Sequence, residues 1–294
     1  MSTEWLDRLQ ERRDGLTKTE RELVSFINDH PDRADETTQK QLAEEAGVSK
    51  PVVISCFRRL GFPDYRSFQS SIELFFATQI DSLRASRRVQ ERVDNLTDLI
   101  EEAASVDVRS LQRFGESLSP EVLASIAERT IAAGTVYCYG EGTGRYPADY
   151  VAQRLRRYGK HSILVGEDRS HTPDTLHPLK KRDALLLFHY SDSDDWLWPL
   201  LQLARSRGVW TMLAAGMIHP DYVAEVSCFV HVPRGELQFK NSLAVPMHFA
   251  NLILLACEVQ YRARTREELA ALEDTRRVWK RAGKNADRQG GTDA

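Results

Sequence analysis

The chain has 294 residues, enough for two domains, and its composition of 41% hydrophobic and 28% charged residues is typical of globular proteins. This composition excludes a collagenous, low-complexity or mostly disordered chain. The 40 basic and 43 acidic residues give a formal net charge of −3, so binding to nucleic acid would require a local basic surface. The most apolar stretch, residues 243–257, contains Pro246, His248 and Asn251 and is too short to span a membrane.

The beginning of the chain and its cysteines lead us to expect a cytoplasmic protein. The first residues have neither the basic region nor the apolar region of a signal peptide. The four cysteines are widely spaced and form no CxxC pair: Cys56, Cys138, Cys228 and Cys257. We expect buried free thiols in a reducing compartment, with no disulfide framework, no metal site and no cofactor.

Residues 1–77 have helical periodicity and no strand-like run, which predicts a small all-helical domain. Thr17 and Glu20 have the spacing of a capping box, in which each side chain bonds to the backbone amide of the other residue. Side chains then recur at helical spacing until Pro31, which ends the predicted helix. These side chains are Leu23, Phe26, Ile27 and His30.

Residues 39–58 have the spacing of a DNA-binding helix-turn-helix. Gly47 occupies the turn position, where glycine adopts a positive φ without strain, and the small Ala43 suits a close helix crossing. Ser49 offers an N-cap for the second helix, which Gly61 ends. The inward faces carry Leu42, Ala46, Val48, Val53 and Cys56. The predicted DNA-contacting residues are Thr38, Ser49, Lys50, Pro51, Ile54, Ser55, Arg58 and Arg59.

The second helix of this pair would enter the major groove with its N-terminal half, while Arg58 and Arg59 would reach phosphates. The charge distribution agrees with this arrangement. Residues 1–48 hold seven basic and twelve acidic side chains, whereas residues 49–92 hold eight basic and four acidic ones. The spacing by itself also fits an ordinary small helical bundle with a glycine turn, so that alternative stays open.

Residues 78–129 are helical and highly charged and predict a helical linker. The stretch 82–88 contains neither proline nor glycine, so we expect a stiff connection there. At the other end, residues 263–294 predict an amphipathic helix over 265–281, followed by a polar, disordered tail from Gly283.

Residues 130–262 change to short apolar runs that alternate with helical stretches. Continuous apolar runs are typical of strands buried on both faces, and the long intervals between them suit helical crossovers. The five predicted strands are 135–140, 161–166, 184–189, 209–214 and 228–232. We therefore expect a doubly wound, parallel α/β domain, with helices over 146–158, 196–207 and 243–261.

Several separated blocks of the first 70 residues resemble, in order, the N-terminal domain of the RpiR/MurR family of bacterial transcriptional regulators. They are Leu-Thr-Lys-Thr-Glu-Arg (16–21), His30-Pro31, Gln-Leu-Ala-Glu-Glu-Ala-Gly-Val-Ser (41–49) and Arg-Leu-Gly-Phe (59–62), with Tyr65 and Phe68. That family carries a sugar-isomerase (SIS) domain after the DNA-reading domain, and residues 130–262 are similar to one in length and strand order. The resemblance implies a regulator that binds double-stranded operator DNA and responds to a sugar phosphate or related carbohydrate derivative. One departure is Ser55-Cys56, where the family usually has Arg followed by Phe.

The resemblance also implies an effector site at the ends of the first and third strands, with further contacts after the fifth strand. The loop of residues 139–145 resembles the family's first-strand loop, and a glycine-rich turn that opens a helix exposes amides that bind anions. The same turn also fits a strand-to-helix connection without a ligand. The implied effector-binding residues are Gly142, Thr143, Arg145, His189, Ser191, Ser193 and Lys240.

The loop after the third strand departs from the family pattern Ser-x-Ser-Gly-x-Thr. Asp192 stands in place of the glycine and Asp194 in place of the threonine, and two carboxylates would repel a phosphate dianion. Three interpretations stay open. Arg145, His189 or Lys240 offsets the acids, or the effector is neutral or cationic, or the site is vestigial and the domain serves assembly.

Two other functions compete with the regulator. A sugar-phosphate isomerase or lyase would need a base over the substrate carbon, and the candidates are His189, Glu141, Asp194 and His248, with no Ser–His–Asp or metal spacing among them. The other is a pure assembly protein. We favour the regulator, which would not be an enzyme, would not contact a membrane, and would form a homodimer or homotetramer that matches a two-fold operator.

Overall fold

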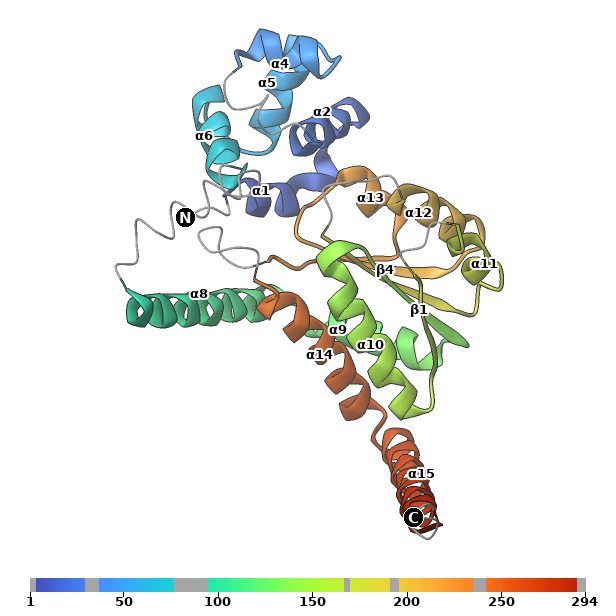
Figure 1. Ribbon diagram of the computed structural model, residues 1–294. Helices are drawn as coiled ribbons and strands as arrows, with labels where there is room; N and C mark the ends of the chain where they lie inside the picture. Colours follow the sequence, from blue (N-terminus) through green and yellow to red (C-terminus); the bar gives the residue numbers. More distant parts are fainter. Residues whose placement is uncertain are drawn as a thin grey trace.

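The computed structural model describes residues 4–29, 37–76, 95–166, 170–190, 196–234 and 242–289. A helical N-terminal domain lies beside an α/β domain, from which two long helices extend (Figure 1). The N-terminal elements are α1 (Glu4–Arg12), the 3-10 turn η1 (Arg13–Gly15), α2 (Lys18–Asp29), α4 (Gln39–Glu45), α5 (Lys50–Arg59) and α6 (Tyr65–Phe76). Across these described ranges, no helix combines the length and the apolar character needed to cross a bilayer.

The predicted capping box and the two predicted glycine turns are present. Ser49 occupies the N-cap position of α5 without a side-chain cap hydrogen bond, and His30 and Pro31 lie outside the described residues. The Thr17 amide donates to Glu20 Oε2 at 2.8 Å, and the Glu20 amide donates to Thr17 Oγ1 at 3.3 Å, which confirms the capping box before α2. Gly47, between α4 and α5, has φ 67°, and Gly61, after α5, has φ 83°. Both glycines therefore occupy left-handed backbone positions, where a side chain would be strained.

A buried aromatic and aliphatic core holds the N-terminal helices together. The rings of Trp5 and Phe68 meet edge to face, with their centroids 5.6 Å apart. The residues predicted to face inward are buried at Leu42, Ala43, Val53 and Cys56 and partly buried at Ala46 and Val48. The predicted helix-turn-helix packing is therefore present.

Five parallel strands form one sheet in the order β2-β1-β3-β4-β5. They are β1 (Thr135–Gly140), β2 (His161–Leu164), β3 (Ala184–His189), β4 (Trp210–Ala215) and β5 (Cys228–His231), which confirms the five predicted strands. Every residue of the central strand β3 is buried, as expected for a strand covered on both faces.

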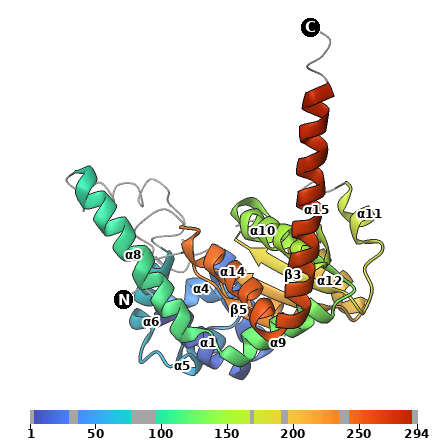
Figure 2. The same cartoon turned by 90° about the horizontal axis from the view of Figure 1, so that it is seen from below.

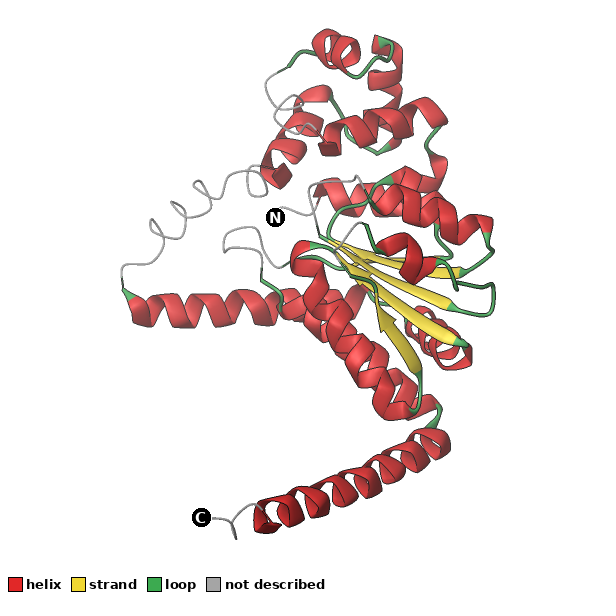
Figure 3. Cartoon of the chain, turned by 45° about the vertical axis from the view of Figure 1, so that its right-hand side comes forward, coloured by secondary structure: helices red, strands yellow, loops and turns green. Residues whose placement is uncertain are grey.

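Helices cover both faces of this sheet (Figures 1 and 3). On one face, α9 (Pro120–Ala132), α10 (Arg145–Leu155) and α14 (Ala244–Gln260) pack around a core that includes Phe188 and Phe249. On the other face, α11 (Thr172–Leu176) and α12 (Leu197–Ser206) pack around Leu187 and Leu213. The domain is therefore doubly wound, as the alternation of strands and helices predicted.

The segment predicted as a helical linker is only partly described. Residues 77–94, including the stretch 82–88, lie outside the described residues. The helices that follow, α8 (Leu96–Ser117) and α9, both pack against α14. Phe114 of α8 and Ile126 of α9 are buried in the α/β core, so this part of the segment belongs to the packing of the α/β domain.

The C-terminal helix is longer than predicted. Helix α15 (Arg262–Gln289) continues through Gly283 to residue 289, where the sequence analysis expected a disordered tail. A single glycine inside a helix costs only about 1 kcal/mol relative to alanine, so the residues around it can carry the helix through. Residues 290–294 lie outside the described residues.

The N-terminal domain rests on the α/β domain through α2 and α13 (Pro220–Glu225), as Figure 1 shows. Ile218, just before α13, is fully buried within the N-terminal core. Nδ2 of the buried Asn28 donates to the Ile218 carbonyl at 3.0 Å, and Ser25 Oγ donates to Asp221 Oδ2 at 3.5 Å. The two domains therefore share a packed and hydrogen-bonded contact.

Candidate DNA-contact surface and ligand site

The outward face of α5 is accessible. Lys50, Pro51 and Arg58 are exposed, and so is Ser49, which occupies the N-cap position of α5. Ile54 is partly buried against the N-terminal core. The basic side chains of Lys50 and Arg58 thus lie near the two ends of an exposed helix face, which suits contact with a phosphate backbone.

Thr38 is exposed at the start of α4, where it forms a second capping box. Its hydroxyl accepts from the Gln41 amide at 3.3 Å, and Gln41 Oε1 accepts from the Thr38 amide at 3.0 Å. The hydroxyl of this predicted DNA contact is therefore already engaged in holding the first turn of α4.

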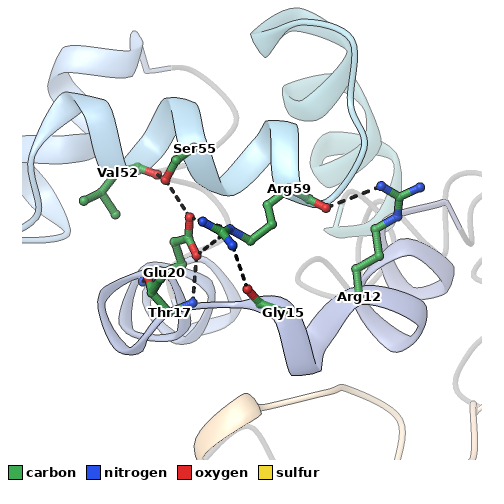
Figure 4. A network of polar contacts seen from close by, with 7 residues as sticks. All are labelled: Arg12, Gly15, Thr17, Glu20, Val52, Ser55 and Arg59. Atoms are coloured by element: carbon green, nitrogen blue, oxygen red, sulfur yellow. Dashed lines mark hydrogen bonds and ion pairs between the residues drawn. The ribbon is translucent and has the colours of Figure 1, made fainter.

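Ser55 and Arg59 turn toward Glu20 of α2 (Figure 4). Ser55 Oγ donates to Glu20 Oε1 at 2.5 Å, and Arg59 Nε lies 3.1 Å from Glu20 Oε2. Arg59 Nη1 also donates to the Gly15 carbonyl at 3.1 Å. Glu20 is 1% exposed, and a carboxylate removed from water needs such donors. Ser55 is thus partly buried, whereas the Arg59 side chain remains 47% exposed although it binds Glu20; their contact with DNA stays a prediction.

The same contacts control the ionisation of Glu20. Burial by itself raises its pKa, but hydrogen bonds from Ser55 and Thr17 and the charge of Arg59 hold the pKa of Glu20 below its ordinary value of 4.5. Glu20 is therefore ionised at neutral pH and binds α5 to the start of α2. Burial also raises the pKa of the nearby Cys56 thiol to about 12, so Cys56 packs as an apolar residue.

Two arginines of α1 bind the C-terminal end of α5. Arg8 Nη1 donates to the carbonyls of Leu60, at 3.4 Å, and Gly61. Arg12 Nη1 donates to the Arg59 carbonyl at 3.5 Å (Figure 4). Carbonyls at the end of a helix lack partners inside it and favour cationic donors. Contacts from α1 and α2 therefore hold α5 in a defined orientation.

A second candidate site lies at the carboxyl edge of the sheet, between β1 and β3. These neighbouring strands lead to helices on opposite faces, α10 after β1 and α12 after β3, which is where open α/β sheets bind ligands. Gly142 and Thr143 lie in the 3-10 turn η2 (Gly142–Gly144), Arg145 begins α10, and His189 ends β3. The structure thus brings four predicted effector-binding residues to one edge of the sheet.

The loop after β1 touches the end of β3. A Cβ atom at Gly144 would collide with the carbonyl of Phe188, so only glycine fits this approach. Two buried hydroxyls, Thr143 Oγ1 and Tyr190 Oη, form no hydrogen bond with the part of the chain that the structure describes. Burial raises the pKa of Tyr190, whose ring centre lies 5.8 Å from the Arg234 guanidinium.

An aromatic cluster, which the sequence analysis missed, joins this edge of the sheet to α13. The ring of Tyr222 lies edge-on to His189, with centroids 6.2 Å apart, and 5.1 Å from the ring of His219. Trp198, which is 41% exposed, lies 6.0 Å from Tyr222. No local pattern could have revealed the cluster, because its members come from β3, α12 and the α13 region and meet only in the folded chain.

Some predicted residues lie outside the described residues: Ser191, Ser193 and Lys240, together with the acids Asp192 and Asp194. Of the candidate catalytic bases, Glu141 and His248 are partly buried and His189 is buried. In the ranges that the structure describes, no group of three His, Cys, Asp or Glu side chains could hold a metal ion.

Comparisons with known proteins found a family match for the N-terminal residues and solved structures of similar fold. Residues 3–79 match the family described as "Helix-turn-helix domain, rpiR family". The uncharacterized HTH-type transcriptional regulator in the aarA 3′ region of Providencia stuartii is 26% identical over 150 residues, which cover 50% of this chain and 51% of that protein. The uncharacterized HTH-type transcriptional regulator YfhH of Escherichia coli is 24% identical over 185 residues, which cover 63% of this chain and 65% of that protein. The chain thus spans between about half and two thirds of the length of these curated relatives.

Solved structures share the fold. The NanR protein of Vibrio vulnificus, complexed with ManNAc-6P, superposes with a TM-score of 0.56 at 19% identity, over 92% of this chain and 97% of that one. The sugar isomerase domain of an RpiR transcription factor from Sphaerobacter thermophilus superposes with a TM-score of 0.52 at 20% identity, over 60% of this chain and 98% of that one. These similarities show an SIS-like α/β domain preceded by a helical domain, as the sequence analysis predicted.

Proposed function

We propose that this chain, whose residues 3–79 belong to the rpiR family of helix-turn-helix domains, is a sequence-specific DNA-binding regulator of transcription. The exposed face of α5 carries the proposal, with Lys50 near its start and Arg58 near its end. Reading the major groove requires a rigid helix whose basic face is open to solvent.

In this proposal, the N-terminal half of α5 enters the major groove. Ser49, Lys50 and Pro51 would face base edges, with Ile54 beside them, while Arg58 would contact a phosphate. The first residues of a helix also present free backbone amides, which favour the negative charge of DNA.

Ser55 and Arg59 act as positioning residues in this proposal. Their bonds to Glu20 support a fixed angle between α5 and α2, which decides how α5 meets the groove. Thr38, at the start of α4, would lie close to the DNA backbone, because the first helix of such a pair crosses it.

We further propose that the α/β domain binds a small carbohydrate derivative where β1 and β3 end. The turn that contains Gly142 and Thr143, the buried hydroxyl of Tyr190, and the side chains of Arg145 and His189 support a polar ligand there. The complex of NanR with ManNAc-6P supports a sugar derivative as the ligand class.

The contact between the domains offers a route from this site to α5. Tyr222 on α13 contacts His189 at the ligand edge. The same helix carries Asp221, which bonds to Ser25 of the N-terminal domain, and follows Ile218, which lies in the N-terminal core. A ligand that moves His189 would shift α13 and the domain resting on it, and such couplings are typically about 1–3 kcal/mol.

We propose that the regulator acts in the cytoplasm as a homodimer or homotetramer, without catalytic activity. A two-fold assembly would present two α5 helices to a two-fold operator. The alternative is an isomerase, because the SIS-like fold also occurs in such enzymes. Turnover of a phosphosugar by the purified chain would favour that alternative.

The experiment is a gel-shift titration of the full chain against its own upstream DNA at several salt concentrations. We expect tight binding that weakens steeply with salt, and a salt slope reduced by about one phosphate contact in Arg58→Ala. The matched control is Arg66→Ala, because Arg66 is an exposed arginine on α6 rather than α5. Circular dichroism should show an unchanged fold in both variants. Equal losses in the two variants would contradict the proposed role of α5.

A further inference from the structure

Exposed apolar side chains gather on three helices of the α/β domain. Large exposed hydrophobic residues on α8, α14 and α15 include Leu96, Ile100, Val108, Leu255, Val278 and Trp279. Outside these helices, the large exposed hydrophobic residues in the described part of the chain are Tyr146 and Trp198. A concentration of this kind marks an interaction surface rather than scattered surface residues.

On α8 these side chains form a continuous row. Leu96, Ile100, Ala104 and Val108 recur every fourth residue, and all four are exposed. Leu96 is 76% exposed and Ile100 is 70% exposed, whereas leucine and isoleucine side chains are among those most often buried. A row at this spacing is the ridge that packs into the groove of another helix.

On α15 the outer half has nothing to pack against within the described chain. Every side chain from Glu273 to Arg281 is exposed, including Val278 at 67% and Trp279 at 81%. In water, a helix is held mainly by burial of its apolar face and only weakly by its own propensity. The position of Trp279 therefore calls for a partner surface.

The two helices have opposite charge. The outer half of α8 contains four acidic residues, Asp98, Glu101, Glu102 and Asp107, and no basic one before Arg109. From Arg276 to Arg281, α15 contains four basic residues and no acidic one: Arg276, Arg277, Lys280 and Arg281. Arg276 and Arg277 also form ion pairs with Glu273 and Asp274, one turn earlier on the same helix. An acidic apolar helix and a basic apolar helix are complementary, and one chain supplies both.

In Figures 2 and 3, α8 and α15 extend from the same side of the α/β domain and diverge from each other, with α14 between them. Because they diverge, the free half of α8 and the free half of α15 are placed to meet helices of another molecule. We infer that the partner is a second copy of this chain, in which α15 of one copy packs on α8 of the other. A two-fold axis then forms two identical contacts and closes the assembly.

This inference identifies the surface of the proposed dimer and does not depend on DNA binding. Its first test measures the mass of the full chain by light scattering across a dilution series. We expect a dimer, and we expect Trp279→Ala and Ile100→Ala each to raise its dissociation constant at least about tenfold. The matched control is Tyr146→Ala, an exposed aromatic residue on α10, which should leave the mass unchanged. A monomeric wild-type chain would overturn the inference.

A charge-reversal cycle tests which helices meet. Glu101 and Asp107 flank the row on α8 and are changed to Lys, while Lys280 and Arg281 on α15 are changed to Glu. We expect either reversal alone to weaken the dimer about tenfold at low salt, and the combination to restore it, because opposite charges face each other again.

Other outcomes of the cycle reject the pairing. If the combination is as weak as the two single reversals together, α8 and α15 do not meet. If reversal on α15 leaves the mass unchanged but weakens DNA binding, the basic helix end contacts phosphates instead, and the inference fails while the proposed function stands.

Discussion

Arg59 Nε lies 3.1 Å from Glu20 Oε2, which joins the last turn of α5 to the first turn of α2. Ser55 Oγ donates to the other oxygen of the same carboxylate, Oε1, and the Thr17 amide donates to Oε2. One buried side chain thus caps α2 and orients the proposed reading helix. In the proposed function, the stability of the N-terminal domain and the recognition of DNA would therefore be linked through Glu20.

The first prediction concerns the loss of this carboxylate. Glu20→Gln should lower the free energy of unfolding by about 1–3 kcal/mol, because it removes the charge that holds Arg59 and weakens several hydrogen bonds at once. Thermal or urea unfolding of the full chain measures the change. Glu22→Gln is the control, since Glu22 is an exposed residue whose ion pair with Lys18 spans 4.0 Å and contributes only about 0.3–0.5 kcal/mol. Similar losses in the two variants would mean that the Glu20 contacts contribute little.

The second prediction is the pH dependence of that stability. Because the folded-state pKa of Glu20 lies below its ordinary value of 4.5, its contribution is fully present above that value and is lost as pH falls through the folded-state pKa. The difference in melting temperature between wild type and Glu20→Gln should therefore be constant near neutral pH and shrink below pH 4.5. A difference that persists undiminished in strong acid would show that ionisation of Glu20 is not its source.

The third prediction separates two glycines. Gly144→Ala should destabilise the α/β domain by about 1–3 kcal/mol, because its Cβ would collide with the Phe188 carbonyl and displace the loop after β1. Gly115→Ala, on α8, meets no atom and should instead stabilise the chain by about 0.5–1 kcal/mol through helix propensity. Calorimetry measures the change in stability of both variants. We expect a loss for Gly144→Ala and a gain for Gly115→Ala, and a gain for both would contradict the close contact at Gly144.

The fourth prediction tests the contact between the domains. Ile218 belongs to the α/β segment but is buried in the N-terminal core, so Ile218→Ala should destabilise the N-terminal domain by about 2–5 kcal/mol. Operator affinity should fall although Ile218 is remote in sequence from α5. Ile163→Ala, which truncates a residue of the edge strand β2 packed on the α/β core, is the control and should leave operator affinity unchanged. The prediction fails if both variants bind DNA as wild type does.

The fifth prediction concerns the effector. The sequence places Asp192 and Asp194 directly after β3, where they would repel a phosphate dianion. In a thermal-shift screen of matched pairs, we expect simple sugar phosphates to stabilise the chain less than the corresponding unphosphorylated derivatives. A large shift with a single sugar phosphate would show that basic side chains outweigh these acids.

Local order was readable from the sequence. The five strands, the capping box of Thr17 and Glu20, and the glycine turns at Gly47 and Gly61 all agree with the structure. Each of these features rests on residues a few positions apart, and the signals for burial and capping act over the same short range. The resemblance of the N-terminal blocks to the RpiR/MurR family then predicted a helical helix-turn-helix domain followed by an SIS-like domain.

Tertiary structure alone decided where particular side chains point. Ser55 lies on the solvent side by helical spacing, yet it binds Glu20 from 35 positions away, and Asn28 binds the Ile218 carbonyl from 190 positions away. Such partners depend on which polar groups the whole fold removes from water, because a buried carboxylate or carbonyl must find a donor wherever the folded chain supplies one. The spacing of residues along the chain does not reveal these long-range hydrogen-bond partners.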